Sequence, residues 1–372
     1  MKSLHRTAPR VLAALVSVTF LPGCAVHSMD RILHAIERKS EESQLLQTRP
    51  HVYGRIPVVF VHGTASSDER WGAMVKALDA DPRIRERFEP WLFAYDSIAP
   101  PLYTANLLRR ALTQAVDRLD PSASDSGLRE MVVVGHSQGG LLAKMTAVRS
   151  EAHFLEGPPN NTKAERNLSD TERERLSEVL RVEPLPFVRS LVFICTPHRG
   201  SFLAASDSMR GIGVQLISMP ARVMRWSTGV LAPEMDANTF WFVRALHSVE
   251  NMSPNSTFVR ELSMLNVAPG VAVHSIVAVS GRRLRTDSDD GVVRYSSAHL
   301  ENVESELLVR SDHSSLERPA IIEEVHRILL EYAADSQGRV GSCAATSARS
   351  RVAPNRAPFG SVAVTSAEAP HD

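Results

Sequence analysis

This chain has few cysteines and no formal net charge. Only three of its 372 residues are cysteine, and Lys+Arg and Asp+Glu each number 42, so the formal net charge is zero. Nucleic-acid surfaces usually carry a basic excess, so this balance argues against a nucleic-acid partner. No repeat of solenoid length is visible either. The 43% of hydrophobic residues is enough for a substantial core, in one large domain or two ordinary ones.

Long apolar runs are also lacking. The stretch VLAALVSVTFL near the N-terminus is shorter than the roughly 20 apolar residues that a comfortable membrane span needs. It follows a positively charged segment that contains Lys2, Arg6 and Arg10. A basic segment followed by a short apolar core is typical of a secretory signal peptide.

The last leucine of this core and the three residues after it, Leu-Pro-Gly-Cys, resemble the bacterial lipobox. The resemblance implies a lipoprotein signal peptide over residues 1–23 and a lipid on Cys24, with Pro22 an unusual occupant of the motif. Ala25, in the next position, is similar to the residue found there in lipoproteins sorted to the outer membrane. This implies a membrane anchor that faces the periplasm of a bacterial cell envelope. The alternative is a plain secreted protein in which Cys24 occurs by chance.

The two remaining cysteines have different surroundings. Cys195 follows the apolar run LVFI, whereas Cys343 lies in a tail rich in Ser, Ala and Arg. A disulfide between them is compatible with an oxidising periplasm. The apolar run favours the other interpretation, in which Cys195 is a buried small hydrophobic residue.

Six short apolar runs indicate the strands of a parallel sheet. They lack polar alternation and are rich in β-branched residues, as are strands covered on both faces. The runs lie at 58–61, 91–95, 131–134, 191–194, 275–279 and, more weakly, 306–309. Helical patterns at 101–119 and 318–332 gather apolar side chains on one face. Strands that alternate with helices predict a doubly wound α/β fold with a mostly parallel sheet and helices on both faces.

Composition indicates the organisation of the whole chain. A charged, proline-punctuated stretch predicts a surface insertion, and a stretch with scattered Met, Trp and Phe predicts a mostly helical cap. A tail with little apolar content predicts disorder. The expected parts are a polar tether (24–56, with some helix around 29–46), the α/β domain (57–335), its insertion (about 151–187) and cap (about 202–268), and the tail (336–372).

The sequence MVVVGHSQGGLLAK places a serine between glycines, where an apolar run meets a helical pattern. One interpretation is a tight turn that Ser137 merely fills. The other is a nucleophile on a strained turn, in which side chains at Gly135 or Gly139 would crowd the backbone. Gly-x-Ser-x-Gly between a strand and a helix is the context that supports the second interpretation.

A serine nucleophile needs hydrogen-bond donors for the oxyanion that its attack creates. The first expected donor is the N–H of Gln138, directly after the serine. The second is expected in the loop after strand 58–61, where His62, Gly63 and Thr64 follow. Gly63 lets the backbone turn so that the N–H of Thr64 points inward. The alternatives are Gly63 itself as the donor, or a plain strand end.

The nucleophile also needs a base, which is expected late in the chain. His313 lies between the last expected strand and the last expected helix, so it shares a sheet edge with Ser137. Two histidines lie too near the serine turn and the oxyanion loop to be free bases, His62 and His136. Rivals of His313 for the role are His198 and His299.

The acid is expected between strand 275–279 and the base, where three aspartates compete: Asp287, Asp289 and Asp290. Asp290 begins an Asp-Gly-Val-Val segment that is similar to the turn carrying the acid in many lipases, so it is favoured, with Asp289 next. Otherwise Asp287 and Asp289 belong to a solvated acidic loop. The stretch lacks the spacing and the distal Glu of an EF-hand calcium loop. Asp312 is expected to cap the last helical region.

Together these segments resemble the α/β-hydrolase family, and within it bacterial lipase-like and GPI-inositol-deacylase-like esterases. The matching segments cover roughly 58–335 and include VVFVHGT, MVVVGHSQGGLLAK, FICTPHRGS, SDDGVVRYSSAHL and ESELLVRSDHSSL. The resemblance implies an α/β-hydrolase fold and ester hydrolysis through an acyl-enzyme. It also implies a triad of Ser137, Asp290 and His313, with Thr64 and Gln138 as the oxyanion hole. One departure is Arg294, where relatives often have proline, which alters the loop beyond the acid.

The expected chemistry requires no metal and no organic cofactor, and its substrate is an ester or a lipid. A lipid anchor and an apolar cap also permit a phospholipase or lipid deacylase at the membrane surface. Amidases and thioesterases use the same machinery. The apolar cap residues suit an acyl pocket or ordinary cap core equally. A different class is a non-catalytic envelope binding protein, which would have no need of all three triad residues. The oligomeric state stays open.

Overall fold

The computed structural model describes residues 43–64, 66–97, 99, 101–150, 181–205, 251–281, 287–345 and 363–365. All of them belong to one unit, Ser43–Asp372. The expected signal peptide, Cys24 and most of the expected tether lie outside the described residues, as do the central parts of the expected insertion and cap. No helix in the described part of the chain is long and apolar enough to cross a membrane.

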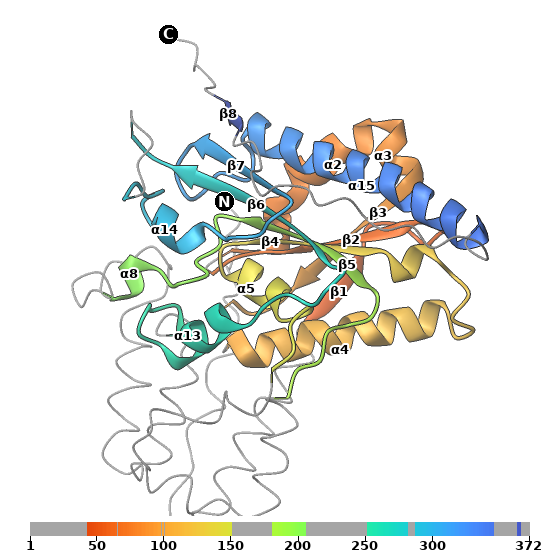
Figure 1. Cartoon of the computed structure of the whole chain (residues 1–372), viewed down its shortest axis with the longest axis horizontal. Coiled ribbons are helices and arrows are strands. Elements are labelled where there is room, and N and C mark those ends of the chain that lie inside the picture. Colours follow the sequence, from red (N-terminus) through yellow and green to blue (C-terminus); the bar gives the residue numbers. More distant parts are fainter. Residues whose placement is uncertain are drawn as a thin grey trace, which may run out of the picture. The chain divides into compact units, whose positions relative to one another are not determined.

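One sheet runs through the described part of the chain, and its eight strands lie in the order β1-β3-β2-β4-β5-β6-β7-β8 (Figure 1). The strands are β1 (Gln44–Gln47), β2 (Ile56–Val61), β3 (Phe88–Ala94), β4 (Met131–His136), β5 (Val188–Ile194), β6 (Ala272–Val279), β7 (Ser305–Arg310) and β8 (Ala363–Thr365). All neighbouring pairs are parallel except β1 with β3. The six predicted strands are confirmed, because each coincides with one of β2 to β7.

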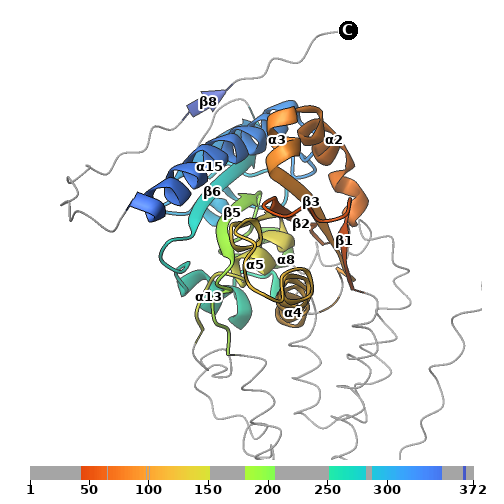
Figure 2. The same ribbon diagram turned by 90° about the vertical axis from the view of Figure 1, so that its right-hand side faces the viewer.

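Helices cover both faces of the sheet (Figures 1 and 2). α4 (Pro101–Leu119), α5 (Gln138–Lys144) and α13 (Thr257–Met264) pack into the apolar core on one face. α2 (Gly72–Ala80), α3 (Pro82–Arg87) and α15 (Pro319–Ala345) pack into the core on the other. The remaining short helices of the described part are η1 (Asp68–Trp71), η2 (Gly127–Arg129), α8 (Phe202–Ala205) and α14 (Tyr295–Ala298). The predicted doubly wound α/β fold is confirmed.

The central strands show why continuous apolar runs were needed. Successive side chains of a strand point to opposite faces of the sheet. Val133 of β4 therefore packs into the core that contains α4, while Val132 and Val134 pack into the core that contains α15. Every residue of β4 is buried. With both faces covered, no position of such a strand is left for an exposed polar side chain.

The domain begins earlier than predicted. Helix was expected around 29–46, but Gln44–Gln47 form β1, which pairs with β3 in the antiparallel direction. The helix prediction is therefore wrong for the part that is described, and the sheet starts inside the expected tether. Leu45 packs against the core on the α4 face, and this contact and the open sheet edge outweigh the local helical pattern. The pairing puts Gln44 opposite Ala94, where β3 ends.

The domain also ends later than predicted. α15 continues to Ala345, past the boundary expected at 335, and β8 pairs with β7 further on. Ser336 is buried on this helix and accepts a hydrogen bond from Arg87 of α3 (3.3 Å). The prediction of disorder from 336 is wrong for these two segments. Composition predicts whether a segment can form its own core, but these residues are ordered by contacts with distant elements.

The expected surface insertion reaches less far than 187. Val182, Leu185 and Phe187 are buried in the core on the α4 face, and the N–H of Ser150 donates to the carbonyl of Val182 (2.8 Å). The prediction is therefore wrong for residues 181–187, because their apolar side chains complete the core beside β5. Residues 151–180 lie outside the described part of the chain. So do residues 206–250 of the expected cap, whose two described ends carry α8 and α13.

Candidate active site

Ser137, Asp290 and His313 lie at the edge where the parallel strands end. Ser137 directly follows β4, Asp290 lies in the loop after β6, and His313 lies in the loop after β7. The carboxyl ends of parallel strands gather at one edge of a sheet, so loops that are far apart in sequence meet there.

Ser137 lies on a sharp turn between β4 and α5. Its backbone has φ 54° and ψ −126°, a conformation that residues other than glycine rarely adopt. A Cβ atom on Gly135 would lie 2.5 Å from the carbonyl oxygen of Gly139, and one on Gly139 would lie 2.2 Å from that of Val61. The crowding predicted at these two glycines is confirmed. The turn has the strained geometry that exposes a nucleophile above the sheet.

The three side chains form a chain of hydrogen bonds. His313 Nε2 lies 2.8 Å from Ser137 Oγ, and His313 Nδ1 lies 2.7 Å from Asp290 Oδ2. An ionised carboxylate can only accept, so Nδ1–H donates to Asp290 and Nε2 is left to accept from the serine hydroxyl. Ser137 and Asp290 are 5% and 3% exposed. The array can take a proton from the serine and hold the resulting imidazolium beside a buried anion.

Among the three competing aspartates, Asp290 is the one that reaches the histidine. Its Oδ1 accepts hydrogen bonds from the N–H groups of Val292 and Val293 (2.9 and 2.7 Å), which leaves Oδ2 for His313. Asp289 is turned to its own loop, where it accepts from the N–H of Gly291 (2.8 Å), and the side chain of Asp287 is exposed. Asp312 is exposed too and accepts from the N–H of Ser314 (3.0 Å) in the loop before α15.

The expected oxyanion loop packs against the serine turn. A Cβ atom on Gly63 would lie 2.9 Å from Ser137 Cβ, so the loop and the turn are in direct contact. The Thr64 hydroxyl donates a short hydrogen bond to the side-chain oxygen of Gln138 and joins the two expected oxyanion residues. Gln138 is the first residue of α5, where N–H groups point out of the helix and the dipole favours negative charge.

Tyr95 contacts His62 in the expected oxyanion loop. No role was predicted for this tyrosine from the sequence. Its hydroxyl donates to the carbonyl of His62 (2.6 Å), and its ring stacks on the imidazole of His62 with centroids 4.1 Å apart. The signal was present in the run WLFAY, which ends in a tyrosine directly after β3, the strand beside β2. Only the pairing of β3 with β2 shows that this end lies next to the oxyanion loop.

The rival histidines are placed differently from His313. His198 is 2% exposed and packs edge-on to Phe193, and burial together with the cations Lys144 and Arg199 holds its pKa well below the usual value. His299 is bound to Glu306 of β7 (2.8 Å) and to the Tyr295 hydroxyl (3.2 Å). Neither contacts Ser137 in the described structure.

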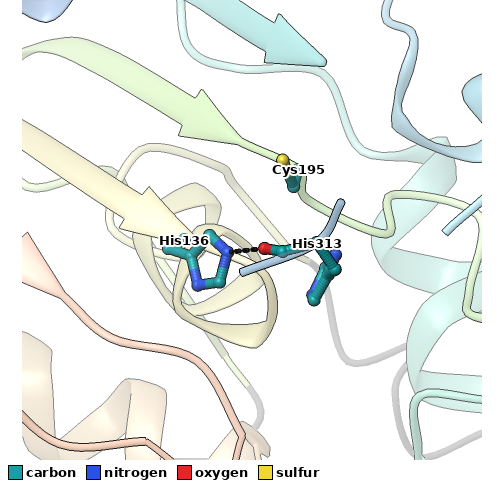
Figure 3. A group of neighbouring side chains, drawn as sticks. All are labelled: His136, Cys195 and His313. Carbon is teal, nitrogen blue, oxygen red and sulfur yellow. Dashed lines mark hydrogen bonds between the residues drawn. The ribbon is translucent and has the colours of Figure 1, made fainter. Parts of the chain in front are cut away.

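His136 and Cys195 lie beside the base (Figure 3). His136 Nε2 hydrogen-bonds the backbone carbonyl of His313 (2.9 Å), and burial and the neighbouring His313 lower the pKa of His136 to about 3. Cys195 is fully buried, as predicted, and it is a free thiol, whereas the side chain of Cys343 lies outside the described part of the structure. Its backbone has φ 51°, a second strained position at this edge.

Cys195, His136 and His313 each offer an atom within 4.8 Å of the others, which raises the question of a metal site. The donor set does not fit one. Both ring nitrogens of His313 are engaged, by Ser137 and Asp290. Burial raises the pKa of Cys195 to about 12, which opposes the thiolate that a metal requires.

The comparison with known protein families agrees with this architecture. A sequence model described as the alpha/beta hydrolase family matches residues 58–325. Among solved structures, the chain is similar to the mature form of lipase BlEst2 from Bacillus licheniformis, with 14% identity, 77% of this chain and 96% of that chain covered, and a TM-score of 0.43. Lipase 1 from Pelosinus fermentans is 12% identical, with 75% and 98% covered and a TM-score of 0.45. The metagenomic carboxyl esterase MGS0156 is 14% identical, with 76% and 79% covered and a TM-score of 0.39.

No curated protein matches the chain by sequence. The family match stands on its own, because it runs from β2 to α15 and includes the strained serine turn, the acid loop and the histidine loop. The chain belongs to the alpha/beta hydrolase family.

Proposed function

We propose that the protein is a serine hydrolase that cleaves carboxylic esters through an acyl-enzyme. The observation that carries the proposal is the unbroken chain of hydrogen bonds from Asp290 through His313 to Ser137, with the serine on a strained turn at a helix N-terminus. A structural serine needs neither the strain nor the buried carboxylate behind its histidine partner.

The reaction uses only these side chains and the backbone. Ser137 Oγ forms a bond to the acyl carbon while His313 Nε2 takes the hydroxyl proton, and the carbonyl electron pair becomes the oxyanion. The N–H groups of Thr64 and Gln138 are assigned to that oxyanion. The oxyanion then collapses and the bond to the alcohol breaks, with the alcohol taking the proton from His313. Asp290 orients and stabilises the imidazolium.

Water completes the cycle by the same steps. His313 removes a proton from a water molecule that attacks the acyl carbon, and the proton returns to Ser137 Oγ as the carboxylic acid leaves. Every proton and electron pair has a place among these groups, so the proposed reaction needs no cofactor and no metal.

The position of β1 favours a second candidate, the hydrolysis of lipids at a membrane surface. Gln44 lies opposite Ala94, at the edge of the sheet where Ser137 also lies. A chain anchored by a lipid on Cys24 would therefore enter the domain on its active-site edge. This supports a phospholipase or lipid deacylase in the bacterial envelope, with the same chemistry and a membrane substrate.

A chain-length series of p-nitrophenyl esters tests the proposal. We expect Ser137→Ala to lower turnover by at least about 10³-fold, as for removal of a triad member. Ser124→Ala, in an exposed loop before β4, is the matched control and should retain full activity. Turnover that survives in Ser137→Ala would sink the mechanism. A preference for long chains that rises at micelle formation would favour the lipid-hydrolysing candidate over a short-chain esterase.

Covalent labelling separates an enzyme from a non-catalytic binding protein. A fluorophosphonate should react once per chain, and mass spectrometry should place the adduct on the peptide that contains Ser137. His313→Ala should slow the labelling, because the serine loses its base. A protein that binds lipid but is not labelled would support the binding function instead.

A further inference from the structure

Ser201 has no role in the proposed mechanism. It lies where three segments of the chain meet. It follows β5 by a short loop, it is 3% exposed, and its N–H donates to the carbonyl of Met252 (2.8 Å), at the far end of the expected cap. Its hydroxyl donates to the carbonyl of Val292 (2.7 Å), in the loop that carries Asp290. The two hydrogen bonds use both donors of this residue.

The peptide group between Val292 and Val293 connects Ser201 to the acid. Its carbonyl accepts from Ser201 Oγ, and its N–H donates to Asp290 Oδ1 (2.7 Å). A hydrogen bond to the carbonyl of a peptide group polarises the group and makes its N–H a stronger donor. The same bond also holds the peptide plane, so that the N–H stays directed at the carboxylate.

We infer that Ser201 is a positioning residue for the acid of the proposed triad. A continuous chain of hydrogen bonds runs from the Ser201 hydroxyl through this peptide group to Asp290, and from there through His313 to Ser137. Donation from the peptide N–H stabilises the charged carboxylate and orients its second oxygen toward His313. The inference rests on the proposed function, because it assigns Ser201 a part in the same site.

Ser297 provides a matched control within the same pair of loops. It is also buried, at 6% exposed, and its hydroxyl also donates to a carbonyl across these loops, that of Gly200 (2.6 Å), while it accepts from the N–H of Arg199 (3.1 Å). The N–H of that second peptide group belongs to Ser201 and points to Met252, away from Asp290. Ser297 therefore joins the loops without a hydrogen-bonded path to the carboxylate.

The other titratable and charged groups near the proposed triad are unchanged in both alanine variants. His136 and Cys195 lie beside His313 and Asp290, and the charge of Arg70 reaches His136. Neither serine contacts these three residues in the described structure. A difference between the variants at positions 201 and 297 can therefore be attributed to the peptide group that each serine bonds.

The test compares Ser201→Ala with Ser297→Ala in the full-length protein. We expect Ser201→Ala to lower kcat roughly 5- to 20-fold at nearly constant KM, the size of one lost hydrogen bond to a charged network. A less stabilised carboxylate holds the proton on His313 more tightly, so the acid limb of the kcat/KM profile should move to higher pH. Ser201→Thr keeps the hydroxyl and should restore the wild-type profile. Ser297→Ala should lower Tm but leave kcat and the acid limb unchanged.

A readout that does not depend on turnover separates this inference from the proposed function. The His313 Nδ1 proton, which bonds Asp290, should give a resolved low-field proton NMR signal that shifts in Ser201→Ala and stays in place in Ser297→Ala. If no ester is hydrolysed, this signal still tests the inference by itself. Equal shifts in both alanine variants, or none in either, would overturn the role of Ser201 and reduce it to loop packing.

Discussion

Gly63 packs directly against the serine turn, and its missing side chain is a requirement of the site. A Cβ atom there would lie 2.9 Å from Ser137 Cβ and 3.2 Å from His136 Nδ1. Real Cβ atoms do not approach others this closely, so either the oxyanion loop or the nucleophile has to move. Its φ is not in the left-handed region, so the constraint is the space beside Ser137 and not the local backbone conformation.

Gly63→Ala should therefore impair turnover more than stability. We expect kcat to fall roughly 10- to 100-fold, because misplacing reacting groups by a fraction of an ångström to an ångström has effects of that size. Gly72→Ala is the control: nothing lies within 4 Å of its Cβ position, and it opens α2, where alanine favours the helix. Steady-state kinetics and thermal unfolding of both variants decide the matter. Equal activity of the two would contradict the close packing.

At the scale of elements, a half-buried histidine joins the segment between β1 and β2 to the amino edge of the sheet. His51 Nδ1 bonds Glu89 of β3 (2.5 Å), and His51 Nε2 bonds Asp125 in the loop before β4 (2.9 Å). Glu89 is fully buried and also accepts from Trp91 Nε1 (3.1 Å). Burial by itself lowers the pKa of His51, but the hydrogen bonds and charges of the two carboxylates outweigh it and raise the pKa.

This cluster should make stability depend on pH in a defined direction. A histidine whose pKa is raised by folding contributes fully below its unfolded value, near 6.5, and loses that contribution as pH rises through the raised folded value. The difference in free energy of unfolding between wild type and His51→Gln should therefore be larger at pH 6 than at pH 8.5. Urea unfolding at the two pH values measures it.

Tyr53→Phe is the control for this prediction. The Tyr53 hydroxyl donates to the carbonyl of Ser124 (2.7 Å) and joins the same segment to the same loop, without a histidine in the contact. Its loss should be equal at both pH values. A pH-independent effect of His51→Gln would show that the histidine acts by packing alone.

At the scale of the whole molecule, the position of β1 bears on the proposed substrate. β1 brings the chain into the sheet at the edge that carries Ser137. A lipid on Cys24, as proposed, would bring the protein to a membrane surface. Hydrolysis of soluble esters should not depend on it.

Cys24→Ser should therefore release the protein from the membrane fraction and leave kcat/KM for soluble esters unchanged. Fractionation of cells, with metabolic labelling by a fatty acid, measures the first effect. Cys343→Ser is the control and should stay with the membrane. Retention and labelling of Cys24→Ser would exclude the lipobox interpretation without touching the proposed chemistry.

Local sequence carried much of this fold because the central strands are covered on both faces. A run such as MVVV at the start of β4 has no exposed position, so its pattern alone indicated a buried strand. The candidate site was accessible for a related reason. Ser137, Asp290 and His313 each follow a strand, and strand ends of a parallel sheet converge at one edge.

The elements at the ends of the domain and beside the insertion could not be predicted from the sequence in this way. β1 exists because β3 offers it an unpaired edge, and Ser336 of α15 is held by Arg87 of α3. Val182 and Phe187 looked like part of a charged insertion, yet they complete the core beside β5. Each depends on a partner far away in sequence, and local propensity does not encode such partners.

The sequence by itself determined the fold class, the strands at the centre of the sheet and the set of residues that could form a serine–histidine–aspartate array. The tertiary structure decided which of three neighbouring aspartates meets His313, and it placed the Tyr95 hydroxyl on the carbonyl of His62 and the Ser201 hydroxyl on the carbonyl of Val292. The physical reason is range. Periodicity and turn motifs act over a few residues, whereas hydrogen-bond partners at this sheet edge are chosen by geometry among residues up to 177 positions apart.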